Sequence, residues 1–107
     1  MVELLIDPGH EGIGKNQDPG AVSIYGVEAT WTYKISKYML ARCKELGINA
    51  MLSRGDNDEI SNSERAKLAS QAVYCFSNHL NAGGGKRSEV IHSIHNNGGL
   101  ANEIADI

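Results

Sequence analysis

The sequence predicts an α/β domain with a twisted, mostly parallel sheet and helices on both faces. Short apolar segments alternate along the chain with segments whose apolar residues recur at helical spacing. The first apolar segment, Leu4-Leu5-Ile6, is continuous, which is typical of a strand buried on both faces of a parallel sheet. At 107 residues, the chain has the length of one small domain.

The N-terminal half is expected to form a strand, a long loop and a helix. The strand stops at Asp7-Pro8-Gly9, and residues 11–26 are rich in Gly, Asp, Asn and Pro, as loops are. Long loops in small domains are often functional. Gly47 is placed to end the helix. The helix is predicted from apolar residues that we expect to pack in the core: Trp31, Ile35, Tyr38, Met39, Cys43 and Leu46.

The C-terminal half continues the alternation. Ser61 and Glu64 have the spacing of a capping box, so a short helix should begin there. We expect strands over 48–52, 73–77 and 89–93, polar loops between them, a turn over 96–99, and helices over 61–72 and from Leu100 onward. Because the last helix is not completed, we expect residues 1–107 to be the N-terminal part of a single domain that lacks its last strands.

Composition excludes several classes of protein. The net charge is −3 and both signs are spread along the chain, so there is no basic stripe for nucleic acid. No apolar run approaches the ~20 residues of a membrane span. The start, MVELLIDPG, has neither the basic nor the apolar region of a signal peptide, so we expect synthesis in the cytoplasm. Cys43 and Cys75 are expected to be buried, reduced thiols in a monomeric protein.

Two histidines follow predicted strands. His10 comes after the first strand and His79 after the third, and ligand sites in parallel sheets lie beyond the carboxyl ends of strands. Glu28, at the end of the glycine-rich loop, would complete a His₂Glu set of the kind that catalytic zinc sites use. From these residues alone, a hydrogen-bonded loop histidine and a glutamate that favours the helix dipole are the more common interpretations.

A series of short motifs makes the zinc interpretation more specific. The segments IDPGHEG, DPGA, LSR, ER, SNHLNA and SEV occur in this order along the chain. Together they resemble the zinc-dependent N-acetylmuramoyl-L-alanine amidases of the amidase-3 type, found in bacterial autolysins, sporulation enzymes and phage endolysins. The resemblance implies a Zn²⁺ ion held by His10, Glu28 and His79. It also implies that peptidoglycan is cleaved between N-acetylmuramic acid and L-alanine of the stem peptide by zinc-activated water.

The sequence departs from this family in one respect that concerns catalysis. The family's general-base glutamate lies on a later strand, and no segment here matches its motif. The alternatives are a catalytically inactive remnant that binds zinc or cell wall, and a different zinc hydrolase whose base is Glu11 or Glu89. Glu11 stands where the family usually has glycine, and we favour a surface loop acid; Glu89 matches a strand position.

The remaining candidates concern substrate and location. Asn81 and Arg65 are weaker candidates for substrate binding. For Arg54 and Arg65, we favour pairing with acids such as Asp56 or Glu64 over a role in bracing the rim near the metal. The resemblance implies that the protein acts on the cell wall, which it would reach by lysis, through a phage holin or from within a mother cell.

Overall fold

A three-stranded parallel sheet forms the centre of the structure, a computed structural model that describes residues 2–80, 89–91 and 98–106. The strand β1 (Val2–Pro8) lies between β4 (Ala50–Leu52) and β5 (Ala72–Asn78). Both neighbours run parallel to β1, and Leu4 is in register with Ala50 on one side and Tyr74 on the other. Leu5 and Ile6 are almost fully buried. The predicted parallel sheet and its doubly buried first strand are therefore confirmed.

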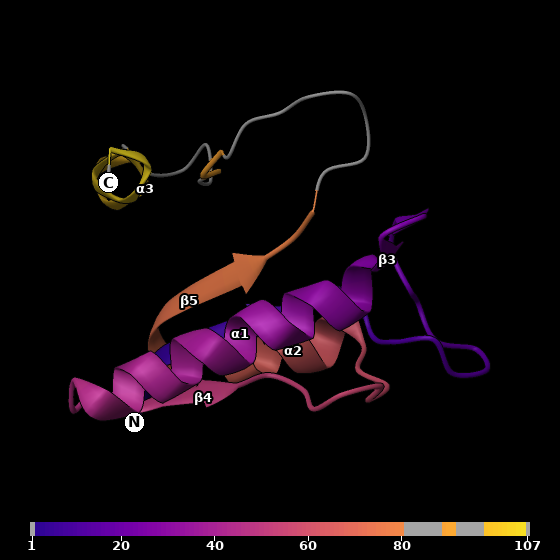
Figure 1. The fold of residues 1–107 in the computed structure, drawn as a ribbon. Coiled ribbons are helices and arrows are strands. Elements are labelled where there is room, and N and C mark those ends of the chain that lie inside the picture. Colours follow the sequence, from indigo (N-terminus) through magenta and orange to yellow (C-terminus); the bar gives the residue numbers. More distant parts are fainter. Residues whose placement is uncertain (1, 81–88, 92–97, 107) are drawn as a thin grey trace.

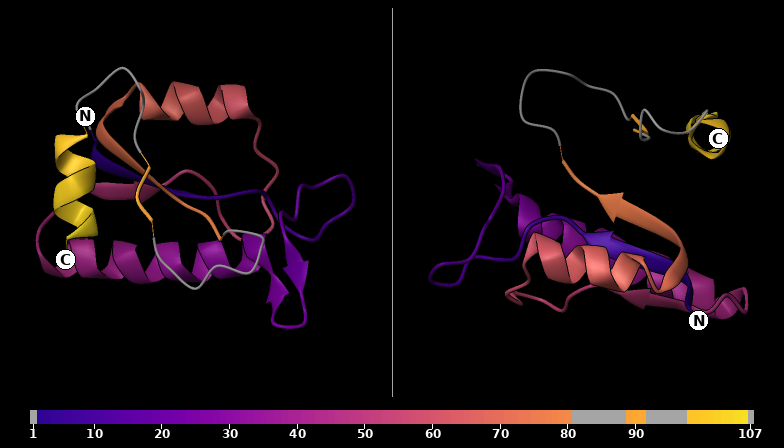
Figure 2. Two further views of the ribbon diagram at one scale, coloured as in Figure 1. Left: turned by 90° about the horizontal axis from the view of Figure 1, so that it is seen from above. Right: turned by 180° about the vertical axis from the view of Figure 1, so that it is seen from behind.

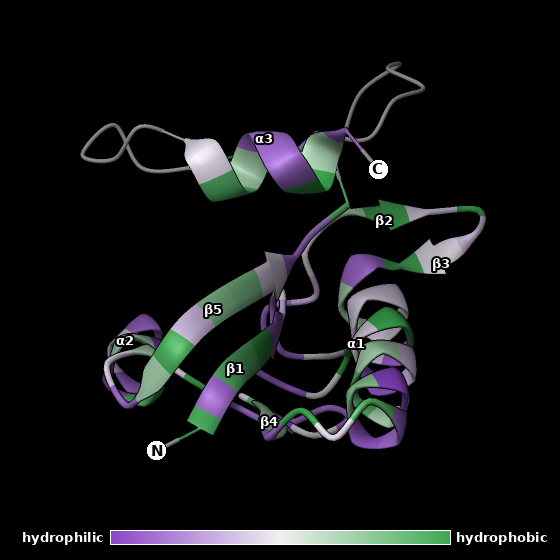
Figure 3. Cartoon of the chain, turned by 90° about the vertical axis from the view of Figure 1, so that its left-hand side faces the viewer, coloured by the Kyte–Doolittle hydropathy of each residue, from purple (hydrophilic) through white to green (hydrophobic). Residues whose placement is uncertain are grey.

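Helices cover both faces of this sheet, as the sequence predicts. The long helix α1 (Glu28–Glu45) and the short helix α2 (Asn62–Ala69) lie on opposite sides of the strands (Figure 3). The predicted capping box is present at α2: the Ser61 hydroxyl accepts from the Glu64 amide at 3.1 Å. The helix ends at Ala69, before the predicted Ala72, because Ala72 already pairs with Val2 in the sheet.

The long loop after β1 contains a small hairpin, formed by β2 (Val22–Ser23) and β3 (Gly26–Val27). The hairpin leads directly into α1, so Glu28 is the first residue of that helix and not a residue of the preceding loop. At the other end of α1, Gly47 adopts the left-handed conformation with φ of 74°, as expected of a glycine that ends a helix.

The prediction of which face of α1 is buried was confirmed at Cys43 and wrong at most other positions. Trp31 and Ile35 are each 41% exposed, and Tyr38 is 78% exposed. The buried face instead carries Thr32 and Ser36, together with Ala29 and Cys43. These hydroxyl residues are buried because they form hydrogen bonds at the ends of the neighbouring strands. The Thr32 hydroxyl donates to the Gly9 carbonyl at 2.9 Å, and the Ser36 hydroxyl accepts from the Asn78 side chain at 3.0 Å. Small hydroxyl residues let α1 approach the ends of β1 and β5, where backbone and amide groups need partners.

The C-terminal part differs from the prediction in one element. The described residues of the expected fourth strand, 89–91, are not in a strand. The helix α3 (Gly99–Ala105) confirms the helix expected near Leu100. It lies apart from the three-stranded sheet (Figure 1, Figure 2). His92, His95 and Asn81 lie outside the described residues.

The two cysteines agree only in part with the expectation of buried, reduced thiols. Cys43 and Cys75 are both free thiols, but only Cys43 is buried; Cys75 lies exposed on the edge strand β5. Among the helices of the described residues, none has the length and apolar character needed to cross a membrane.

Candidate metal centre

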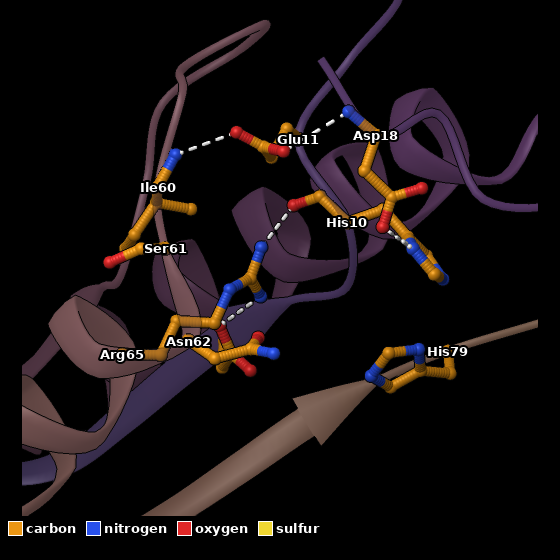
Figure 4. A pocket seen from close by; sticks show the side chains of 9 residues that line it. His10, Glu11, Asp18, Ile60, Ser61, Asn62, Arg65 and His79 are labelled. Atoms are coloured by element: carbon orange, nitrogen blue, oxygen red, sulfur yellow. Dashed lines mark hydrogen bonds and ion pairs between the residues drawn. The ribbon is translucent and has the colours of Figure 1, made fainter. Parts of the chain in front are cut away.

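The three predicted metal ligands come together at the carboxyl edge of the sheet. His10 follows β1 and His79 follows β5; these strands are neighbours, with Pro8 in register with Asn78. The two rings meet edge to face, with centroids 5.1 Å apart and planes at 84° (Figure 4). Glu28 reaches the same point from the first turn of α1. The ligand atoms of all three side chains lie within 4.8 Å of one another.

Two of the three distances between these ligand atoms suit a small tetrahedral metal site, and the third lies within 4.8 Å. Glu28 Oε2 lies 3.1 Å from His10 Nε2 and 3.3 Å from His79 Nδ1. A tetrahedral zinc with bonds of ~2.0–2.1 Å separates neighbouring ligand atoms by about 3.3 Å. Two imidazoles and one carboxylate are also donors that zinc prefers, and three protein ligands leave a fourth position for water. The residues therefore fit a catalytic type of zinc site.

Glu28 is held as a buried, charged carboxylate. Its side chain is only 4% exposed. Burial alone would raise the pKa of Glu28, but amide donors and facing imidazoles outweigh it and lower the pKa below its usual value. The donors are the Ala21 amide, which reaches Oε1 at 3.0 Å, and the Leu80 amide, which reaches Oε2 at 3.0 Å. The carboxylate thus stays ionised and is fixed by backbone from two other segments.

Asp18 orients His10 and was not identified as a site residue from the sequence. Its Oδ2 lies 2.7 Å from His10 Nδ1, while the Gly20 amide donates to Oδ1 at 3.0 Å. The hydrogen bond with His10 lowers the pKa of Asp18. A carboxylate that accepts from Nδ1 fixes the imidazole with Nε2 free for the metal, which is the usual outer partner of a ligating histidine. The only signal in the sequence was the motif DPGA.

Two glycines allow the ligand side chains to pack against the backbone. A Cβ on Gly20, whose φ is +70°, would lie 2.5 Å from His10 Cδ2 and 2.8 Å from Glu28 Oε1. A Cβ on Gly9 would lie 2.6 Å from His79 Nδ1. Ordinary carbon contacts are about 3.5–4.0 Å, so any side chain at these positions would displace a ligand.

The chain segment that leaves β1 is held by two arginines; Arg65 pairs with an acid as expected, but not with either of the acids named as examples. Arg54 is 5% exposed and donates to the carbonyls of Pro8, Gly9 and Ala29 at 2.8–3.1 Å. Arg65 pairs with Asp7 at 2.7 Å and donates to the carbonyls of Pro8 and His10. Neither forms the expected pair with Asp56 or Glu64. Both therefore brace the rim near the metal ligands, which was the less favoured interpretation.

Glu11 is a loop acid, as the favoured interpretation expected, and it has a structural role in that loop. Its Oε1 accepts from the Asp18 amide at 3.1 Å and its Oε2 accepts from the Ile60 amide at 2.9 Å (Figure 4). The carboxylate therefore ties the loop after His10 to the segment before α2. Among the described residues, the group that could hold a metal includes neither Glu11 nor Glu89, and Glu89 is exposed.

A polar cavity of about 510 Å³ opens beside the two histidines and reaches the start of α2 (Figure 4). It is lined by Asp7, His10, Glu11, Asp18, Ile60, Ser61, Asn62, Arg65 and His79. A fourth ligand or a substrate could therefore approach the metal ligands from this side.

Comparison with known proteins gives the family. Residues 4–106 match the family model described as N-acetylmuramoyl-L-alanine amidase, of the amidase-3 type, and the chain belongs to this family. Among curated proteins, it is similar to the sporulation-specific N-acetylmuramoyl-L-alanine amidase of Bacillus subtilis strain 168. The identity is 36% over 90 residues, which are 79% of this chain and 33% of that protein. The chain therefore spans about a third of the length of this relative.

Two solved structures have the same fold. An N-acetylmuramoyl-L-alanine amidase of Nostoc punctiforme is 29% identical with a TM-score of 0.65, over 75% of this chain and 44% of the other. The catalytic domain of such an amidase from Bacillus (Paenibacillus) polymyxa var. colistinus is 28% identical with a TM-score of 0.67, over 79% and 48%. The α/β fold predicted from the sequence is that of amidase catalytic domains.

Proposed function

We propose that this chain carries the zinc-binding part of a peptidoglycan amidase that acts on the cell wall. The reaction is hydrolysis of the amide between N-acetylmuramic acid and L-alanine of the stem peptide. The observation that carries the proposal is the convergence of His10, Glu28 and His79 at one edge of the sheet, within 4.8 Å, in a member of the amidase family.

The ligands have separate tasks in this proposal. His10 and His79 donate ring nitrogens to zinc, and Glu28 supplies the negative charge that partly neutralises it. Asp18 keeps His10 in the tautomer that presents Nε2. When bound, zinc supplies a Lewis acid for the amide carbonyl and a water of pKa near ~7. The cavity beside the histidines gives the substrate amide its approach.

A second candidate function is an inactive remnant that binds zinc or cell wall. It is favoured by the state of the carboxylates that line the cavity. Asp7 is bound to Arg65, Glu11 to two backbone amides, and Asp18 to His10. Among the described residues of the cavity, each acid is thus already engaged, whereas a general base must be able to exchange a proton with the attacking water.

The first experiment measures zinc by equilibrium dialysis and elemental analysis. We expect one zinc per chain for the parent, and loss of that zinc in His79→Ala and Glu28→Gln. Glu45→Gln is the matched control, because Glu45 lies at the opposite end of α1 from Glu28 and its side chain is 66% exposed. A folded parent without zinc, or zinc retained in both site variants, would contradict the metal site.

The second experiment separates the two candidate functions. The zinc-loaded chain is incubated with purified peptidoglycan, and new L-alanine amino groups are identified by mass spectrometry of the released peptides. Release that is absent in His79→Ala supports the amidase. Zinc binding or sedimentation with cell wall, without release, supports the inactive remnant.

A further inference from the structure

We propose that Arg65 is a positioning residue for the metal centre, acting through the backbone of His10 and not through substrate. The proposal rests on the proposed metal site. Arg65 lies on α2, on the opposite face of the sheet from α1, which carries Glu28. Arg65 therefore reaches the site from the face of the sheet opposite to the helix that carries Glu28.

Both terminal nitrogens of the guanidinium group donate to the segment that carries His10. One terminal nitrogen donates to Asp7 Oδ1 at 2.7 Å and to the Pro8 carbonyl at 2.9 Å, and the other donates to the His10 carbonyl (Figure 4). The Arg65 side chain is 15% exposed and that of Asp7 is 11% exposed. These bonds use three of the five N–H groups of the guanidinium, including both N–H groups of the nitrogen that meets Asp7.

The backbone of His10 needs such support. Its φ is +64°, in the left-handed region that residues other than glycine rarely adopt. This conformation turns the ring so that Nδ1 meets Asp18 and Nε2 meets Glu28. A rare conformation at a functional residue persists only where its surroundings over-determine it. The Arg65 bond to the His10 carbonyl fixes the peptide plane immediately after the rare φ.

Arg65 also belongs to a cluster of polar side chains centred on Asp7, close to His10 in the chain. Asp7 accepts from the hydroxyls of Ser53 at 2.6 Å and Ser77 at 2.7 Å as well as from Arg65. These serines follow β4 and lie on β5, so the cluster joins all three strands at their carboxyl ends. Arg65 thereby links the position of His10 to the strand that delivers His79.

The test is Arg65→Lys, because lysine can keep the charge pair with Asp7 but cannot hold both carbonyls with a planar fork. Arg42→Lys is the control: it makes the same substitution at an exposed arginine, which pairs with Glu45 at the end of α1 away from Glu28. Zinc affinity is measured by competition with a chelator where unfolding curves show each variant to be folded. We expect Arg65→Lys to lose at least tenfold in affinity, the size typical of a lost outer partner, and Arg42→Lys to stay within about threefold.

A readout without metal tests the positioning itself. In the metal-free, ¹⁵N/¹³C-labelled chain, His10 should show the backbone shifts and the strong contact between its own amide and Hα protons that a positive φ gives. Arg65→Lys should lose this signature and Arg42→Lys should keep it. If Arg65→Lys does not fold, the pair Arg65→Gln with Asp7→Asn replaces it, since that pair leaves no buried charge unpaired.

The outcomes are distinct. Unchanged affinity and an unchanged His10 signature in Arg65→Lys would overturn the proposal, as would equal losses in both arginine variants. If the parent binds no zinc while Arg65→Lys alone alters His10, the proposed function fails and the positioning role of Arg65 stands.

Discussion

Gly20→Ala offers a sharp test of how the site is packed. The new Cβ would lie 2.5 Å from His10 Cδ2, at least about 1 Å closer than an ordinary carbon contact. It would also lie 2.8 Å from Glu28 Oε1, so neither ligand can stay in place. In addition, the φ of +70° strains alanine by about 1–2 kcal/mol. Each kcal/mol lowers Tm by about 4–8 °C in a domain of this size.

The matched control for this substitution is Gly47→Ala. Gly47 has nearly the same φ, +74°, but its Cβ would meet nothing within 4 Å. Both variants should therefore show a comparable loss of stability from backbone strain. Only Gly20→Ala should lose zinc affinity, by about tenfold or more, because only there does the added methyl group displace metal ligands.

The assay combines thermal unfolding, followed by circular dichroism on the metal-free chain, with zinc affinity measured on the folded protein. If Gly20→Ala and Gly47→Ala bound zinc equally well, the positions of His10 and Glu28 in this structure could not be those of the metal-bound protein. If Gly20→Ala lost no stability either, the left-handed conformation at that residue would be refuted as well.

Three further predictions concern the acids around His10. Asp18→Asn should weaken zinc binding by about 10–100-fold at unchanged stoichiometry, and a change below threefold in the dialysis measurement would contradict its orienting role. Because the pKa of Asp18 is lowered in the folded state, its contribution to stability should be present above about pH 4 and be lost as the pH falls through the lowered pKa. Urea unfolding of the parent and Asp18→Asn at several pH values checks this; a difference that grows toward low pH would show the wrong sign. Glu11→Ala should cost about 1–3 kcal/mol of stability yet retain one zinc, with the exposed Glu3→Ala as control, and loss of zinc would make Glu11 a ligand.

The sequence predicts that His10 and His79 meet at one edge of the sheet, because their placement depends on topology. His10 and His79 each follow an apolar strand, and two parallel neighbours must bring the residues after their ends to one edge. Glu28 required the resemblance, since a glutamate in the first turn of a helix has an ordinary electrostatic explanation. The strands β1, β4 and β5 could be predicted for the same reason as the histidines: their apolar or β-branched runs are short and bounded by turn residues.

The supporting contacts could not be predicted in this way. Arg65 and His10 are separated by 55 positions in the sequence, and their bond joins a side chain to a backbone carbonyl. No periodicity encodes such a bond, because any residue can supply the carbonyl. The same limit explains the error at α1. Hydrophobic periodicity placed Trp31 and Ile35 in the core, whereas Thr32 and Ser36 are the residues that meet the polar ends of the strands.

The placement of these polar contacts follows from the chemistry of the site. A metal centre at the end of a parallel sheet needs ligands on chain segments that have just left regular hydrogen bonding, so their carbonyls and amides lack strand partners. Here side chains replace those partners. Arg54 and Arg65 donate to the carbonyls of residues 8–10, and Glu28 accepts from the amides of Ala21 and Leu80. The groups that satisfy the backbone are thus the same ones that fix the ligands. For this reason, substitutions that loosen the backbone at the sheet edge should affect metal affinity before they affect the fold.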